Sequence, residues 1–120
     1  MIIKTALSDV TSYITSDGSE IRELLHPTLH AVRNQSFAEA VVLPRAKTRL
    51  YRHAISEEIY HITHGCGLMT LGMTSFAIAV GDSIAVAPGT PHCVENLGTD
   101  ALHILCCCAP AYSHDDTTLL

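Results

Sequence analysis

The sequence predicts a single all-β domain, built as a sandwich or a barrel. Turn-forming residues recur along the chain at short, even intervals, and apolar, β-branched or alternating segments of strand length lie between them. Short strands separated by turns every ~8–12 residues are typical of all-β sandwiches and barrels. No internal repeat, low-complexity tract or linker divides the 120 residues into two domains.

Four strands are expected in the first half of the chain. A turn at Asp17-Gly18 precedes the first of them, and Pro27 and Pro44 interrupt the chain after the first and second, because proline cannot donate a hydrogen bond within a sheet. A short loop separates the third strand from the fourth. The expected strands are Ile21–Leu25, Ser36–Leu43, Thr48–His53 and Glu58–Thr63.

Five more strands are expected between glycine- and proline-rich turns in the second half. The turns are Gly65-Cys66-Gly67, Gly72, Gly81-Asp82, Pro88-Gly89-Thr90-Pro91 and Asn96-Leu97-Gly98. The expected strands are Gly67–Leu71, Ser75–Val80, Ser83–Val86, His92–Glu95 and Ala101–Cys108. Only Thr5–Ile14 and the extreme C-terminus suggest a helical period. The polar tail Ser113–Thr118 is expected to fray or to lie across a neighbour.

Composition and charge limit the classes of function. Hydrophobic residues make up 48% of the chain and charged residues 16%, which indicates a globular protein rather than a disordered one. Seven Lys and Arg against twelve Asp and Glu give a formal net charge of −5 with no basic run, so neither nucleic acid nor an anionic membrane is an expected partner. With no membrane-spanning stretch and no secretory signal pattern, we expect a cytoplasmic protein.

Three of the five cysteines are consecutive. Cys106, Cys107 and Cys108 match no disulfide framework and no CxxC pair. On a strand, Cys106 and Cys108 share one face and Cys107 takes the other. We expect reduced thiols that pack as small hydrophobic side chains, with a metal or thiolate role as the alternative.

A histidine, a glutamate and a distant histidine form a candidate metal site. His53 and Glu58 are separated by four residues, and His92 follows the proline-rich turn far downstream. Strands of a closed sheet can bring such residues to one interior point, where they would bind a divalent cation. The alternative is three unrelated surface residues.

Two segments resemble the paired signatures of the cupin superfamily. TRLYRHAISEEIYHITHG, at residues 48–65, resembles G-x5-H-x-H-x4-E-x6-G, and GDSIAVAPGTPHCVEN, at residues 81–96, resembles G-x5-P-x-G-x2-H-x3-N. The resemblance covers about residues 34–108, and the upstream run GSEIRELLHP is similar to that of small single-domain bacterial cupins. It implies one jelly-roll barrel domain over residues 1–120, with a C-terminal tail at 109–120 and a mononuclear metal site inside.

The resemblance assigns metal-binding positions to three residues of this chain. His53 stands at the second histidine of the first signature, Glu58 at its glutamate and His92 at the histidine of the second signature. Four further positions match structural residues of the signatures, namely Gly65, Gly81, Gly89 and Asn96. The chain departs from the pattern at three positions, which are Arg45 for the first glycine, Ala87 for a proline and Tyr51 for the first histidine.

The tyrosine at position 51 leaves three alternatives open. Tyr51 and His53 are two residues apart on a strand, so both side chains can face the interior. A phenol is a poor ligand for Zn²⁺ or Ni²⁺ at neutral pH. Without Tyr51, two histidines and one carboxylate suit non-haem Fe(II). A ligating Tyr51 would favour Fe(III) or Mn, and a decayed site would hold no metal. The expected cofactor is one divalent transition metal ion, either Fe, Mn, Ni, Zn or Cu.

Several neighbours of the site have an expected place. Tyr60 shares the face of Glu58, so it is either a proton donor at the site or an aromatic of the barrel core. We expect His61 to face away from the metal, and we expect Glu57 and His64 to be solvated. His103 is a weak candidate for a substitute ligand. The cavity is expected to be lined mainly by Leu, Ile, Val and Met. A basic cluster near its mouth would either receive an acidic substrate or form a solvated strand face, and its members are Arg45, Lys47, Arg49 and Arg52.

These observations favour a metal-dependent enzyme that acts on a small molecule. A dioxygenase, or a sugar or sugar-acid isomerase or lyase, fits the resemblance, with Tyr60 and Tyr51 as candidate catalytic residues. The alternative is a non-enzymatic module that binds a small molecule at a degenerate metal site. We also expect a homodimer that covers exposed strand edges through Ile2–Ile14 and Ile21–Leu25.

Overall fold

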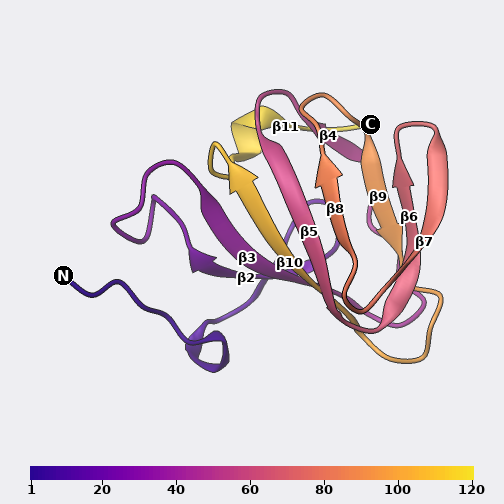
Figure 1. The fold of residues 1–120 in the computed structure, drawn as a ribbon, viewed down its shortest axis with the longest axis horizontal. Helices are drawn as coiled ribbons and strands as arrows, with labels where there is room; N and C mark the ends of the chain where they lie inside the picture. The colour runs from indigo at the N-terminus through magenta and orange to yellow at the C-terminus, as the bar shows by residue number, and fades with distance from the viewer.

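A computed structural model describes residues 1–120 and shows two antiparallel β-sheets with two short 3-10 helices (Figure 1). The first six elements are η1 (Leu7–Asp9), β1 (Tyr13–Ile14), β2 (Glu20–Leu25), β3 (Ser36–Val42), β4 (Tyr51–His53) and β5 (Glu57–His64). The remaining elements are β6 (Cys66–Leu71), β7 (Thr74–Ala79), β8 (Ser83–Val86), β9 (His92–Glu95), β10 (Leu102–Ala109), η2 (His114–Asp116) and β11 (Thr117–Leu119). All nine expected strands are present, and every end lies within one residue of its expected position except the start of β4, which lies three residues later.

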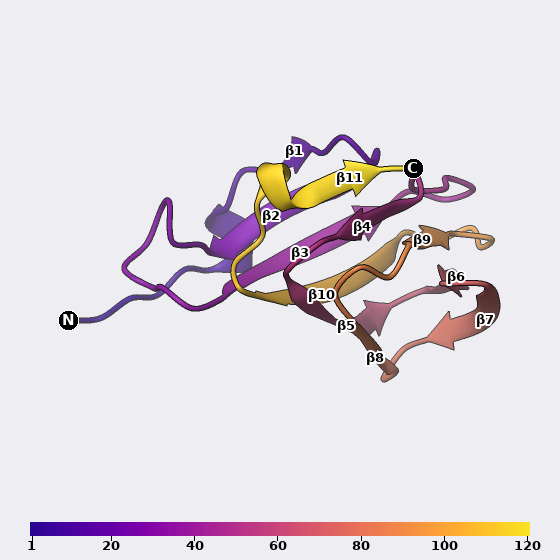
Figure 2. The same cartoon turned by 90° about the horizontal axis from the view of Figure 1, so that it is seen from above.

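The two sheets have the crossed connections of a jelly roll. One sheet has the order β1-β2-β3-β10-β5-β8 and the other β11-β4-β9-β6-β7. Consecutive strands therefore often lie in different sheets, and β10 lies between β3 and β5, as Figure 1 shows. Seen from above in Figure 2, β11 runs beside β4 along the upper side of the molecule. No helix of the fold is long and apolar enough to cross a membrane.

Alternation along β5 and β10 separates the interior from the surface. Along β5, Glu58, Tyr60 and Ile62 are buried while the residues between them are exposed. The even-numbered residues of β10 are buried in the same way. The core between the sheets is closed by fully buried side chains, which are Ile62, Met69, Ile78, Leu102 and Ile104. This alternation confirms an all-β fold with one apolar interior.

The two segments with a possible helical period are not α-helices. Within Thr5–Ile14 the chain forms only the single-turn helix η1 and the short strand β1. The C-terminal tail forms η2 and then β11, which pairs with β4 and sets Thr117 opposite His53. Of the two expectations for the tail, fraying is therefore wrong and the tail lies across a neighbouring strand, because the edge of β4 supplies its backbone partners.

Close backbone contacts explain the two glycines of the turn Gly65-Cys66-Gly67. Gly65 has a φ of +80°, and a Cβ built on it would lie 2.7 Å from the carbonyl oxygen of Ala101. A Cβ on Gly67 would lie 2.5 Å from the carbonyl oxygen of Glu95. Both positions therefore require glycine so that neighbouring backbone can approach.

Arg45 adopts the backbone conformation expected of the glycine that it replaces. Its φ is +67°, and the amide of Ala46 donates a hydrogen bond of 3.0 Å to the carbonyl of Leu43. A tight turn with proline second and a positive φ third is the type II pattern, which usually takes glycine at that third position. Arg45 therefore holds a left-handed conformation that costs about 1–2 kcal/mol for an L-residue.

We predict that Arg45→Val lowers the free energy of unfolding by about 1–2 kcal/mol, because a β-branched side chain tolerates positive φ poorly. Arg45→Gly should stay within about 1 kcal/mol of the wild type, since relief of strain offsets the greater freedom of the unfolded chain. Urea denaturation measures both. The matched control is Arg52→Val on the exposed face of β4, and equal stability of Arg45→Val and Arg52→Val would contradict the prediction.

Candidate metal centre

Three buried side chains from three strands converge at one end of the interior. His53 ends β4, Glu58 is the second residue of β5, and His92 begins β9. Oε1 of Glu58 lies 3.3 Å from Nε2 of His53 and 3.4 Å from Nε2 of His92. The side chains are 2%, 6% and 0% exposed for His53, Glu58 and His92. The structure thus brings together the three residues that the sequence singles out as ligands, and it selects Glu58 over the exposed Glu57.

The partners of the outer ring nitrogens assign the protons of both imidazoles. Nδ1 of His92 lies 2.9 Å from the carbonyl oxygen of Thr90, which can only accept, so this nitrogen carries the proton. The hydroxyl of Thr117 donates to the carbonyl of Ser113 at 2.8 Å, and its oxygen accepts a hydrogen bond from Nδ1 of His53 at 2.9 Å. In the neutral form, both histidines therefore direct a lone pair on Nε2 into the interior.

This arrangement fits a divalent cation. Two nitrogen lone pairs and a carboxylate oxygen face one another, and they repel unless a proton or a cation lies between them. Nε2 of His92 is fully buried and has no hydrogen-bond partner, although it lies 3.4 Å from Glu58. Two imidazoles and a carboxylate, each held by an outer hydrogen bond, are the donor set that divalent transition metals accept in proteins.

The carboxylate of Glu58 is ionised at neutral pH. Burial alone raises the pKa of Glu58, but the close contacts with His53, His92 and Cys108 outweigh it and hold the pKa at about 2. The site therefore presents a fixed negative charge in the interior.

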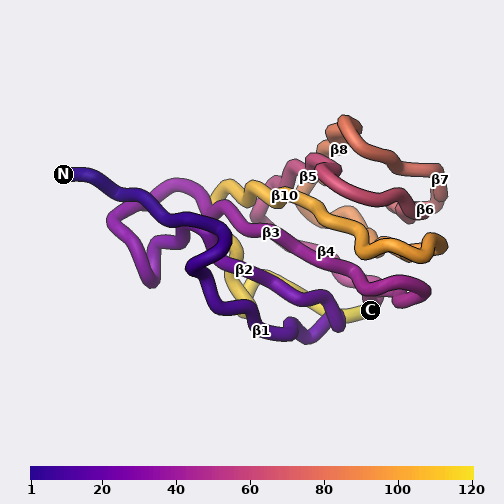
Figure 3. The backbone as a smooth tube through the Cα atoms, turned by 90° about the horizontal axis from the view of Figure 1, so that it is seen from below, coloured from indigo at the N-terminus to yellow at the C-terminus, as the bar shows by residue number.

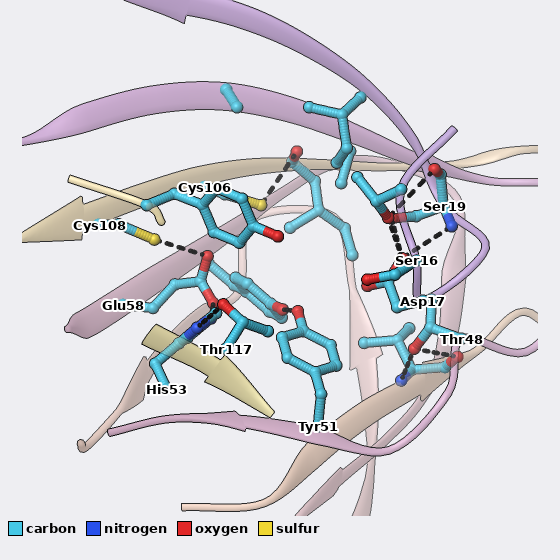
Figure 4. Close-up of a pocket in the computed structure, with 18 of the residues that line it drawn as sticks. Ser16, Asp17, Ser19, Thr48, Tyr51, His53, Glu58, Cys106, Cys108 and Thr117 are labelled. Carbon is cyan, nitrogen blue, oxygen red and sulfur yellow. Dashed lines mark hydrogen bonds and ion pairs between the residues drawn. The ribbon is translucent and has the colours of Figure 1, made fainter. Parts of the chain in front are cut away.

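Cys108 also lies at this end of the cavity. The sequence patterns alone do not assign this cysteine to the site. Its Sγ is 3.1 Å from Oε2 of Glu58, and the donor atoms of His53, Glu58 and Cys108 all lie within 4.8 Å of one another (Figure 4). Burial and the charge of Glu58 raise the pKa of the Cys108 thiol, so the thiol donates a hydrogen bond to the carboxylate. Strand alternation gives the face of Cys108, but only the pairing of β10 with β5 sets it opposite Glu58.

Tyr51 lines the cavity but its hydroxyl is engaged elsewhere. The ring packs on His92 with centroids 4.3 Å apart, and the hydroxyl forms a hydrogen bond of 2.8 Å with the hydroxyl of Tyr60. Burial, and then the charge of Glu58, raise the pKa of both phenols well above the ordinary value. Tyr51 and Tyr60 are therefore a pair of neutral hydroxyls beside the candidate ligands.

The other candidate residues lie outside the site. His61 is exposed and bonds to Ser83, and His64 is exposed with its ring against that of His103. His103 lies 3.3 Å from Glu39 and is not near the three ligands. All five cysteines are free thiols.

Comparisons with known proteins place the chain in a family. The model of the Cupin domain family matches residues 38–108. The protein is a cupin. An uncharacterised protein of Methanocaldococcus jannaschii is 52% identical over 119 residues, with 99% of this chain and 95% of that protein covered.

Solved structures share the cupin fold at low sequence identity. A predicted oxalate decarboxylase of Thermotoga maritima has a TM-score of 0.79 at 23% identity, covering 91% of this chain and 99% of its own. The Streptomyces nucleoside dehydratase Pac13 has a TM-score of 0.80 at 15% identity, covering 100% and 92%. The polyketide cyclase RemF of Streptomyces resistomycificus has a TM-score of 0.80 at 19% identity, covering 91% and 80%. These proteins have different activities, so the shared fold does not select one.

The cavity of this cupin is more polar than the sequence suggests. All four tyrosines of the chain line it, together with the carboxylates of Asp17, Glu23 and Glu58. Leu, Ile and Val supply only five of the lining residues and Met none, so the expectation of a lining mainly of these types is wrong. The basic cluster is exposed and supplies no lining residue, which fits the alternative of a solvated strand face. Figure 4 shows His53, Glu58 and Cys108 at one end and Asp17 and Ser19 at the other. Polar side chains of β1, β2 and the tail also line the cavity. The alternation of buried and exposed residues in the core strands does not predict them, because these segments lie outside those strands.

The four tyrosines should make the stability of this cupin sensitive to alkaline pH. Burial raises the pKa of all four phenols above their ordinary value near 10. Their contribution to stability is therefore complete below pH ~10 and is lost as pH rises toward the folded-state pKa values. In chelator-treated protein, phenolate absorbance should be small at pH ~10 and should then increase together with unfolding.

The absence of tryptophan makes tyrosine the main source of this signal. Protein unfolded in guanidinium is the control and should titrate near pH ~10. Ionisation of all four phenols near that pH in protein that stays folded by circular dichroism would contradict the prediction.

Proposed function

We propose that this cupin is a mononuclear metalloenzyme in which His53, Glu58 and His92 hold one divalent transition metal ion. The observation that carries the proposal is the fully buried Nε2 of His92, which lacks a hydrogen-bond partner and faces the carboxylate of Glu58 at 3.4 Å. A metal at this point would satisfy that nitrogen, the matching nitrogen of His53 and the charge of Glu58 together.

The residues around the ligands support proton transfer or substrate orientation. When bound, the metal supplies Lewis-acid polarisation of a substrate oxygen or, as iron, oxygen chemistry. The Tyr51–Tyr60 hydroxyl pair lies beside the ligands, and its raised pKa keeps it protonated, which favours a hydrogen bond to a bound substrate over transfer of a proton at neutral pH. Thr117 and the carbonyl of Thr90 hold the two imidazoles in orientation.

The cavity favours a small, polar substrate that is uncharged or cationic. Three carboxylates and no lysine or arginine line the cavity, so a dianion would meet repulsion that one divalent ion only partly offsets. The Tyr51–Tyr60 hydroxyl pair and several Ser and Thr side chains line the cavity and would form hydrogen bonds with hydroxyl or amine groups. The structural neighbour Pac13 has been solved with uridine, an uncharged polar molecule. An isomerase, lyase or dehydratase type of reaction fits such a substrate.

A binding module without turnover is the second candidate. The replacement of the first signature histidine by Tyr51 favours it, because one fewer imidazole weakens metal binding. A ligand that raises the melting temperature of the protein without being converted would identify this case. The five free thiols support the cytoplasm, a reducing compartment, for either function.

We predict about one equivalent of iron, manganese, nickel, copper or zinc in protein purified without an affinity metal column. His92→Ala should weaken metal binding by at least about tenfold. Loss of a residue that only hydrogen-bonds to a ligand typically lowers metal affinity about 10–100-fold, and loss of a ligand itself should lower it at least as much. Elemental analysis and competition with a chelator measure this. His61→Ala is the matched control, because His61 is exposed and faces away from the site. A wild type that neither contains metal nor takes it up would leave the binding module as the better account.

We further propose that the protein is a homodimer that pairs through its N-terminal segment. Figure 3 shows this segment leaving the body of the molecule, and Met1 and Ile2 are fully or nearly fully exposed. Ile14 of β1, at the edge of its sheet, is 68% exposed. A second copy would cover these apolar side chains and the strand edge.

Light scattering is expected to give the mass of a dimer for the full chain and of a monomer after removal of residues 1–6. Replacing an equally exposed apolar residue at a distant hairpin, Met73→Ser, should leave the mass unchanged. A monomeric full chain would contradict this prediction.

A further inference from the structure

We propose that the sulfur of Cys108 is a fourth ligand of the metal, and that it replaces the signature histidine that is absent at Tyr51. This inference rests on the proposed metal site and assigns it a ligand from a strand that carries no residue of the two cupin signatures. A set of two imidazoles, one carboxylate and one thiolate selects a thiophilic ion such as Zn²⁺ over Mn²⁺.

Strand register places the sulfur at the site. Cys108 of β10 lies directly opposite Glu58 of β5, and opposite residues of an antiparallel pair share one face with Cβ atoms about 4.5–5.5 Å apart. Cys108 is 3% exposed, and its Sγ approaches Oε2 of Glu58 at 3.1 Å. The two oxygens of this carboxylate therefore face different candidate ligands, with Oε1 toward the histidines and Oε2 toward the thiol.

The spacing of the donor atoms matches one shared ion. Ligands bound at about 2.0–2.3 Å around a tetrahedral centre lie about 3–4 Å from one another. The donor atoms of His53, Glu58 and Cys108 are all within 4.8 Å of one another, and Nε2 of His92 lies 3.4 Å from the carboxylate. His92 lies outside this group of three, so binding of all four atoms to one ion requires side-chain adjustments that bring Nε2 of His92 and the sulfur of Cys108 closer together.

The neighbouring candidates do not offer this ligand. The hydroxyl of Tyr51 is bonded to Tyr60 at 2.8 Å. Cys106 shares the buried face of β10, but it lies opposite Tyr60 and its sulfur contacts the carbonyl of Ile104 at 3.8 Å. Only Cys108 among the five cysteines belongs to the cluster of donor atoms.

Coordination exchanges one bond of the thiol for another. The S–H group that now donates to Oε2 of Glu58 loses its proton to solvent, and a metal–sulfur bond forms in its place. No oxidation or reduction takes place. The positive charge of the ion makes the thiolate the stable form beside it, as in other metal–thiolate sites.

Cobalt substitution tests the assignment through a spectroscopic signature. The full chain is loaded with Co²⁺, and unbound ion is removed by gel filtration. A thiolate ligand gives an intense near-ultraviolet sulfur-to-cobalt charge-transfer band in addition to the visible d–d bands. We expect both sets of bands in the wild type. In Cys108→Ser the charge-transfer band should vanish while the d–d bands remain.

Cys106→Ser is the matched control, because it changes the same residue type on the same buried face two positions away. It should keep both sets of bands, and Zn²⁺ affinity should be at least about tenfold higher in Cys106→Ser than in Cys108→Ser. Cys66→Ser should also keep the bands, which excludes binding at the exposed thiol.

The outcomes separate this inference from the proposed function. Visible Co²⁺ bands without a charge-transfer band in the wild type would overturn the Cys108 ligand and leave the metal site standing. A charge-transfer band that survives in Cys108→Ser would overturn the assignment to this residue. Failure of the wild type to bind Co²⁺ or Zn²⁺ would overturn both proposals. If a variant does not fold, the presence or absence of the charge-transfer band in the wild-type spectrum still tests for a thiolate ligand.

Discussion

The buried carboxylate of Glu58 is the constraint on which the candidate site depends. An ionised carboxylate in an apolar interior is strongly destabilising unless several groups compensate its charge. Here one oxygen faces two imidazoles and the other faces a thiol, and these contacts hold the pKa at about 2. Each partner comes from a different strand, which are β4, β9 and β10. The charge of one residue thus ties both sheets together at the end of the cavity where the chemistry would take place.

The hydrogen bonds behind the histidines are as important as the histidines themselves. Thr117 lies in the C-terminal strand β11, and it orients His53 because its own hydroxyl proton is committed to Ser113. The carbonyl of Thr90, in the turn before β9, does the same for His92. Both contacts leave a lone pair directed inward, so the tail and a turn determine whether the site accepts a cation. The C-terminal tail is therefore part of the site and not an appendage to the barrel.

Sequence patterns predicted the strands and the ligand triad because both depend on local spacing. Alternation gives the buried face of β5, and hence Glu58 over Glu57, while the two signatures locate His53 and His92. Cys108 could not be assigned in this way, since its proximity to Glu58 depends on the register between strands 50 residues apart in the chain. Strand β11 was missed for a similar reason, because a short polar segment becomes a strand only where an open edge accepts it. The polar lining of the cavity likewise comes from β1, β2 and the tail.

The cavity is lined partly by the region that matches the cupin family and partly by the segments on either side of it. This division separates metal binding from substrate choice. The residues that would hold the metal, His53, Glu58 and His92, all lie within the part of the chain that matches the cupin family, residues 38–108. Tyr13, Asp17 and Glu23 line the cavity from outside that part, as do Tyr112, Thr117 and Leu119 of the tail. Changes at Tyr13, Asp17 or Glu23 would alter the charge and hydrogen bonding that a substrate meets without touching a ligand, whereas Thr117 also orients His53. Cys108 is the last residue of the matched region and the point where the two parts meet. A thiolate at that position would join the metal-binding end to the part of the cavity that lies outside the matched region.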